Sequence, residues 1–176
     1  LMAIDDVSVV ITDPKGEIHE KTKRMMYKKG YKIAHLNLYN PQKSIRYNLL
    51  QSCSSIEEVR KLSESILGDD EWGKLSQTLL QAFLFRAYER GESLSDVVDA
   101  LAVSPTDLYE LELDYFTDTN DQAKLAFKQF AKTAGGEAFV SSVFATIQSR
   151  MKVFEFDNIR QISQNANFDI GYLREH

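Results

Sequence analysis

The sequence contains few of the residues that cross-link a chain, interrupt its helices or bind metals. Its 176 residues include one cysteine, three prolines, eight glycines and three histidines. Cys53 has no second cysteine with which to form an internal disulfide, which fits a reducing compartment, and it is most simply a small half-buried residue. No run approaches the ~20 apolar residues needed to span a bilayer, and no signal peptide is visible. We therefore expect a soluble chain without disulfides.

The residues that are present favour a folded protein whose charge is unevenly distributed. Hydrophobic residues make up 43% of the chain and aromatic residues 11%, which is enough for one compact domain and argues against disorder. The net charge is -5. Residues 13–50 carry nine Lys and Arg against three Asp and Glu, whereas residues 51–176 carry twelve against twenty-one. This difference predicts two structural units with different surroundings.

The first unit is predicted to be a strand, a helix and a second strand. The apolar run Val7–Thr12 is typical of a buried strand and is followed by Pro14 and Gly16. Good helix formers dominate residues 17–29, with acids in the first turn, lysines in the last and Gly30 placed to end the helix. "YKIAHLNL" alternates as a second strand does. Such a βαβ unit belongs in a parallel sheet with more strands than are present here.

The second unit is predicted to be entirely helical. Ser55 and Glu58 form a capping-box pattern for a helix to about Leu67, and Asp69 and Asp70 precede a long helix that ends at Gly91. Ser93 should cap a short helix, Ser104-Pro105 should begin another, and further helices are expected near 120–133, 137–152 and 157–164. In the long helix, Trp72, Leu75, Leu79, Leu80, Phe83, Leu84 and Ala87 follow helical spacing. The expected core is Leu79, Leu80, Phe83, Leu84, Phe127, Phe130, Phe139, Val143, Phe144 and Ile147.

Two stretches have the composition of a binding site. Residues 89–121 hold ten acids against one Lys or Arg, which is either a solvated face or a docking surface for a basic protein. Residues 94–112 have the pattern of a helix-turn-helix: a short helix, a tight turn and a second helix. The second helix, however, would present acids to DNA phosphates. The candidate residues of the docking surface are Asp107, Glu110, Glu112, Asp114, Asp118 and Asp121.

Catalytic and metal-binding patterns are not found. The phosphate-binding pattern G-x-x-x-x-G-K-[ST] does not occur, and no later strand ends in Asp-Glu to hold a metal-bound nucleotide. His19, His35 and His176 are dispersed and lack the spacing of metal ligands, and His19 is most simply a surface residue. We therefore expect no catalysis, no cofactor and no metal in this chain, and Asp13 and Lys15 are either ligand-binding groups at the end of a strand or simple turn residues.

Three quoted segments, taken in order, resemble one family. "SVVITDPKGEIHEKTKRMMYKKGYKIAHLNLYNPQKSIRYNLL" is similar to the stretch after the Walker A loop in the coupling proteins of type IV secretion and conjugation, the TraG/TraD group, although Tyr47-Asn48-Leu49-Leu50 lacks the usual proline. "DDEWGKLSQTLLQAFLF" resembles a helix of that family, and "GGEAFVSSVFATIQSRMKVFEFDNIRQISQNANFDI" resembles the end of its inserted all-α domain.

The resemblance implies a mainly α fold, a helical bundle inserted in a split RecA-like α/β domain of which only a short βαβ remnant is present. Residues 1–50 would be that remnant, 51–166 the all-α domain and 167–176 the return segment. Both Walker motifs are absent, so the chain itself would not be an enzyme. The parent protein would be a hexameric DNA-translocating ATPase that uses ATP and Mg at the cytoplasmic face of the bacterial inner membrane. Asp13, Lys15 and Glu17 would lie near its nucleotide site.

The resemblance also implies partners. The all-α domain would bind a relaxase, another relaxosome protein or an effector and deliver it to the secretion channel. The chain alone would be a monomer without direct membrane contact, and would meet DNA weakly or only through the parent. The alternatives are a helical DNA-binding module that uses residues 94–112, and a purely structural lid whose helices only support the hexamer.

Overall fold

The computed structural model describes residues 8–164 and 166–174, and within them the chain is mainly helical with no β-strand. The α-helices of the described residues are α1 (Glu17–Lys28), α2 (Ile56–Leu67), α3 (Glu71–Glu89), α4 (Leu94–Val103), α5 (Leu108–Leu111), α6 (Asp121–Thr133), α7 (Glu137–Met151) and α8 (Asp157–Ser163). Between them lie the π-helix η2 (Glu112–Phe116) and the 3₁₀ helices η1 (Pro41–Lys43), η3 (Lys152–Glu155) and η4 (Ile170–Arg174). The predicted mainly α class is confirmed.

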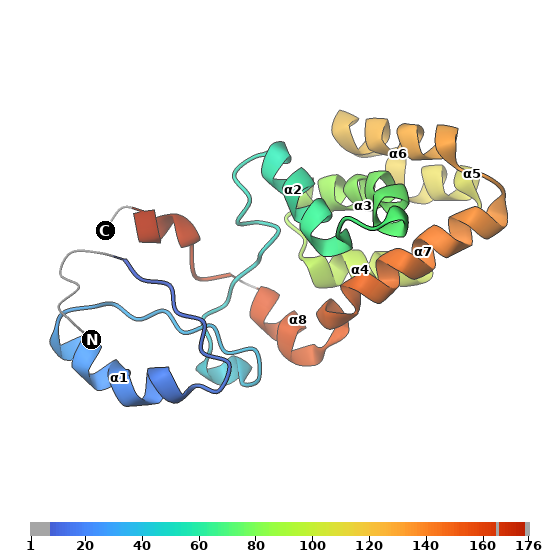
Figure 1. Cartoon of the computed structure of the whole chain (residues 1–176). Helices are drawn as coiled ribbons and strands as arrows, with labels where there is room; N and C mark the ends of the chain where they lie inside the picture. The colour runs from blue at the N-terminus through green and yellow to red at the C-terminus, as the bar shows by residue number, and fades with distance from the viewer. Residues whose placement is uncertain (1–7, 165, 175–176) are drawn as a thin grey trace.

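Helix α3 is the centre of the helical body. It packs against α2, α4, α6 and α7, and these helices surround it in Figure 1. Being surrounded, α3 is apolar on most of its circumference and buries Leu79, Leu80, Ala82, Phe83, Leu84, Phe85 and Ala87. Nine of the ten predicted core residues are buried, and Phe139 is half-buried and stacks on Phe130.

Aromatic rings fill the space between α3 and the helices that follow it. The Phe83 ring lies edge-on to Phe116, with centroids 5.2 Å apart, and to Phe144 at 6.3 Å. Phe116 in turn stacks on Phe127 of α6 at 4.6 Å. These contacts connect α3, η2, α6 and α7 through adjoining rings, an arrangement that stabilises aromatic pairs beyond their buried area.

Helices α2, α3, α4 and α6 begin at capping side chains. Ser55 Oγ accepts from Glu58 N, Asp70 Oδ1 from Gly73 N and Asn120 Oδ1 from Ala123 N. Ser93 and Asp96 form a complete capping box at α4. At α2 the Glu58 carboxylate accepts from Ser54 N, one residue before the expected donor. The predicted caps at Ser55 and Ser93 are thus confirmed, and the helices expected from Asp69-Asp70 and near residue 120 begin at Glu71 and Asp121.

The predicted strands are wrong. Residues 8–12 and 31–37 have no regular secondary structure and residue 38 lies in a turn, so neither segment forms a strand in the described part of the chain, and residue 7 lies outside it. A strand needs a ladder of backbone hydrogen bonds to a neighbour. Ile45 N donates to His35 O at 2.9 Å, but one such bond between two segments is not a ladder. Apolar alternation alone therefore did not produce a sheet here.

Two helical predictions also need correction. Pro105 does not begin a helix; α5 starts at Leu108, where Asp107 Oδ1 accepts from Tyr109 N and Glu110 N. Trp72 and Leu75 do not belong to the buried face of α3: they are 47% and 42% exposed, whereas Gly73 and Ser76 of the same two turns are buried.

The chain enters and leaves the helical body at one place. Arg46 N donates to Asn167 Oδ1 at 2.8 Å, and Asn167 N donates to Arg46 O at 3.0 Å. Tyr47 N donates to Ile162 O at 2.9 Å. Figure 1 shows α1 and its loops on one side of the molecule, α2–α7 on the other, and α8 between them. No helix within the described residues combines the length and apolarity required to cross a membrane.

Candidate functional site

The predicted acidic residues lie on one continuous stretch of the helical body. Asp107, Glu110, Glu112, Asp114, Asp118 and Asp121, called the acidic surface below, run from the start of α5 through η2 to the first turn of α6. All are exposed except Glu112, which is half-buried. None of them forms an ion pair within the described residues. Their charge is therefore available to a partner from outside.

Contacts to the end of α3 hold this stretch in place. Glu89 Oε2 accepts from Asn120 N at 2.9 Å, and Asn120 Nδ2 donates to Phe85 O at 3.1 Å. Arg90 Nη2 donates to the carbonyl of Asp118 at 3.3 Å. Leu111 and Phe116 anchor the same stretch in the core, so the acidic surface stands on a rigid support.

Apolar side chains lie among these acids, and sequence reasoning missed them. Tyr109 is 70% exposed, and Leu113 and Leu125 are each 53% exposed. They belong to α5, η2 and α6, the elements that carry the acids. The π-helical turn, a feature frequent at functional sites, contains Leu113. An apolar patch with a charged rim is typical of protein-binding surfaces.

The same geometry is unsuited to reading DNA. The second element of the supposed helix-turn-helix is α5, which has four residues and continues as a π-helix. A recognition helix needs a straight face that enters the major groove, with cations near the phosphates. Here the exposed side chains Glu110 and Asp114 are acidic. The structure gives no support to the DNA-binding alternative at 94–112.

Asp13 and its neighbours form the start of α1. Asp13 Oδ2 accepts from His19 N at 2.8 Å, and the carbonyl of Asp13 accepts from Gly16 N at 3.1 Å. Gly16 occupies the cap position in the left-handed region with φ 71°, a conformation that favours glycine. Glu17 pairs with Lys21 at 3.7 Å on the surface. Asp13 therefore caps the helix, while Lys15 is exposed on the turn.

The structure brings together two histidines that appear dispersed in the sequence. The rings of His19 and His35 stack with centroids 4.0 Å apart and an interplanar angle of 14°. A metal lies in the plane of each ring that binds it, so these parallel rings cannot share one ion at ~2.0–2.1 Å. His176 lies outside the described residues. No group of three or more potential ligands that could hold a metal occurs in the described residues.

The burial of Cys53 agrees with its interpretation as a structural residue. Its thiol is half-buried and lies 3.7 Å from the carbonyl of Leu49. Burial, assisted by the nearby charge of Glu58, raises the pKa of the Cys53 thiol. A thiol of this kind has a smaller thiolate fraction than free cysteine and is a poor nucleophile.

The histidine stack should be sensitive to pH. Burial, followed by the charge of His19, lowers the pKa of His35; Asp13 and Glu20 act in the opposite direction, and Lys23 lowers it further. The unfolded chain, with a histidine pKa of ~6.5, therefore binds more protons than the folded chain. The contribution of His35 to stability is therefore present above the pKa that His35 has in the unfolded chain. It is lost as the pH falls through the lower pKa that His35 has in the folded chain.

We expect the His35 ring to titrate below a free histidine in an NMR titration. Amide exchange in α1 should also become faster as the pH falls through this range. The variant His35→Phe keeps an aromatic ring at the stack and should remove that part of the pH dependence. A His35 ring that titrates at or above the free value would contradict the prediction.

Comparison with known proteins gives one match. A family described as type IV secretory system conjugative DNA transfer matches residues 1–176. No curated protein and no solved structure matches the chain. The family match includes the helical body and both flanking segments.

Proposed function

The chain belongs to the family of type IV secretory system conjugative DNA transfer proteins, and we propose that its helical body recognises a protein to be transferred. In this proposal residues 51–166 are the recognition domain. They bind a relaxase, another relaxosome protein or an effector and bring it to the secretion channel.

The observation that carries the proposal is the acidic surface with its exposed apolar side chains. A basic partner would be steered to the acids of α5 and η2 by complementary charge. Tyr109 and Leu113 would then supply the apolar contacts that give most of the binding energy at protein interfaces. Since the surface is fixed to α3 and the core, little order need be gained on binding.

The layout of the chain supports the remaining parts of the proposal. Because Arg46 and Asn167 exchange hydrogen bonds, the helical body leaves and rejoins the flanking segments at one point, as an inserted domain does. Residues 1–50 and 167–176 would then belong to the nucleotide-binding domain of a hexameric ATPase at the inner membrane. Asp13, Lys15 and Glu17 would lie near its ATP and Mg, and the present chain would not turn over ATP.

Charge reversal on the acidic surface tests the proposed recognition. The triple variant Glu110→Lys, Glu112→Lys, Asp114→Lys should bind a purified relaxase of the same conjugative element at least about tenfold more weakly, because like charges oppose encounter and docking. Biolayer interferometry at low salt measures the affinity directly.

The control is a second triple variant with the same change in net charge elsewhere. Glu57→Lys, Glu64→Lys, Glu155→Lys alters exposed acids of α2 and η3 and should bind nearly as the unaltered chain does. Equal weakening in both variants, or none in the first, would remove the acidic surface from consideration.

A further inference from the structure

One face of α5 and η2 carries exposed apolar side chains at helical spacing. Tyr109 and Leu113 are four residues apart, on consecutive turns, and so share one face of this helical stretch. Both side chains are more than half exposed. Figure 1 shows α5 and α6 at the end of the helical body that is farthest from α1. These two residues, called the apolar row below, are therefore open to a partner.

A row of acids runs beside the apolar row. Glu110 and Asp114 are also four residues apart, each one position after a member of the apolar row. Asp118 continues the same spacing in the turn after η2. All three acids are exposed, and none forms an ion pair within the described chain. The surface thus combines the apolar row with a neighbouring row of negative charge, called the acid row below.

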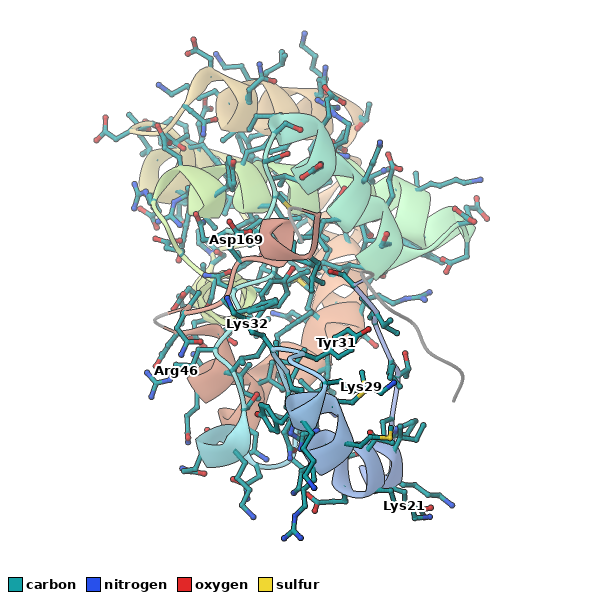
Figure 2. The ribbon with its side chains drawn as sticks, turned by 90° about the vertical axis from the view of Figure 1, so that its left-hand side faces the viewer. Lys21, Lys29, Tyr31, Lys32, Arg46 and Asp169 are labelled. Carbon is teal, nitrogen blue, oxygen red and sulfur yellow. The ribbon has the colours of Figure 1, made fainter. Side chains whose placement is uncertain are left out.

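The cations of the chain do not neutralise the acid row. Residues 13–50 hold nine of the 21 Lys and Arg, and Figure 2 shows Lys21 and Lys29 at the end of the molecule that holds α1. Exposed charges more than about 8 Å apart are largely screened at physiological salt. Lys124 and Lys128 belong to α6, which packs against η2, but neither pairs with an acid within the described residues. The neutralising cations must therefore come from the partner.

The form of this surface favours one of the common modes of peptide recognition. Strand addition needs a free sheet edge, and the described residues contain no strand. A proline-rich segment needs a groove lined by aromatic rings, whereas Tyr109 is the one exposed ring of α5 and η2. A phosphorylated or acidic motif needs clustered arginines, and the charge here has the opposite sign. A helix, in contrast, presents apolar side chains at intervals of three and four residues, which match the apolar row.

The stretch that carries both rows is fixed to the core, so the rows keep their spacing. Leu111 and Phe116 of the same stretch are buried, and Phe116 stacks on Phe127 of α6 with ring centroids 4.6 Å apart. Side chains of one helix pack into the grooves between the side-chain rows of another. A fixed pair of rows therefore offers a helical partner one preferred register.

We propose that α5 and η2 bind an amphipathic basic helix of the partner. The apolar side chains of that helix pack on Tyr109 and Leu113, and its Lys and Arg side chains face the acid row. This inference rests on the proposed function, because the helix belongs to the protein that the helical body recognises. It adds the structural class of the recognised element, which is a helix with adjoining apolar and cationic rows and not an extended basic tail.

Three synthetic peptides of about 18 residues, long enough to form a helix, test the proposal on the whole chain. The first has leucines at i, i+3, i+4 and i+7, lysines beside them and alanines elsewhere. The second has the same composition in an order that distributes the leucines around the helix. The third is the first peptide with a central alanine replaced by proline, which breaks a helix and leaves the charge unchanged. Fluorescence anisotropy of the labelled peptides measures the affinity of each.

The first peptide should bind at least about tenfold more tightly than the other two, because it alone contacts both rows at once. Circular dichroism of its mixture with the chain should show more helix than the two components measured separately. The double variant Tyr109→Ala, Leu113→Ala should bind the first peptide about tenfold more weakly and the second nearly as before. The double variant Glu110→Gln, Asp114→Asn should weaken the binding of all three peptides, since all carry the same charge.

The matched control for the apolar variant is the double variant Leu75→Ala, Val153→Ala. These side chains are also exposed, but they belong to α3 and η3, outside the acidic surface. The control should bind the first peptide as the unaltered chain does. Circular dichroism of each variant verifies that the helical body is folded.

Three outcomes would overturn the proposal. Equal affinity for the first and second peptides would mean that charge alone attracts them. Equal affinity for the first and third would mean that the peptide binds in an extended form. Unchanged binding of the first peptide by the double variant Tyr109→Ala, Leu113→Ala would place the helix elsewhere on the chain.

The experiment separates this inference from the proposed function. If charge reversal weakens relaxase binding but the three peptides bind alike, recognition by the acidic surface stands and the helix is rejected. If the first peptide binds selectively but the relaxase does not respond to charge reversal, the helix-binding surface stands and the relaxase is rejected as its partner. When both hold, the first peptide should displace the relaxase and the second should not.

Discussion

Replacing Phe83 by Ala is expected to lower the free energy of unfolding by about 3–5 kcal/mol. Phe83 is 1% exposed and contacts Tyr115, Phe116 and Phe144, so the change removes the ring that joins α3 to η2 and α7. The surrounding rings are held by their own helices and cannot close the space. Urea unfolding followed by circular dichroism measures the difference.

Trp72→Ala is the matched control on the same helix. It deletes a larger ring, but Trp72 is 47% exposed and outside the core. We expect a loss of no more than about 1 kcal/mol, in the range of surface substitutions with some burial. A similar loss in both variants would mean that the inner face of α3 is misplaced.

The helical body could be predicted because its signals are local. A capping side chain and the three-to-four-residue apolar period depend on residues within a few turns, and both specify helix starts and buried faces directly. Ser55 and Ser93 cap α2 and α4 as their positions in the sequence indicate. The exposure of Trp72 and Leu75 could not be predicted, because it depends on which side of the first two turns of α3 is covered; Gly73 and Ser76 of the same turns are buried.

The errors arise where the outcome depends on distant residues. Residues 31–38 have the apolar alternation of a strand, but they form no ladder of backbone hydrogen bonds within the described chain. Alternation in one segment cannot provide the neighbouring strand that a ladder needs. The stack of His19 on His35 requires the chain to turn back after Gly30, which sequence spacing did not reveal. Pro105 was predicted to begin a helix, but the helix begins at Leu108, where Asp107 caps it.

The candidate site was predictable in its charge but not in its shape. Acid counts identified the stretch from Asp107 to Asp121, since charged residues in a folded chain lie at the surface. The exposure of Tyr109 and Leu113 could not be foreseen, because the same residue types at Leu111 and Phe116 are buried. The π-helical turn determines which of these side chains face the core, and neither capping residues nor apolar spacing indicates such a turn in the sequence.

Gly73→Ala should destabilise the chain by roughly 1–3 kcal/mol, although Ala is the better helix former by ~1 kcal/mol. A Cβ at this position would lie 2.6 Å from the carbonyl oxygen of Leu67 and 2.9 Å from that of Gly68. Both obstacles are backbone atoms, so the end of α2 and the start of α3 must separate. The exposed neighbour Lys74→Ala should change stability by no more than about 0.5 kcal/mol.

Whether Gly73→Ala raises or lowers the free energy of unfolding shows which effect dominates at this turn, helix propensity or the packing of α2 against α3. If helix propensity dominated, the variant would be more stable than the unaltered chain in urea unfolding, and the close approach of α2 to α3 would be readily relieved. Relief is opposed on both sides of the turn. Gly68 is held at φ 74°, and Asp70 both caps α3 through Gly73 N and pairs with Arg150 of α7. Because the backbone cannot shift without disturbing these contacts, steric overlap should prevail and the variant should be the less stable protein.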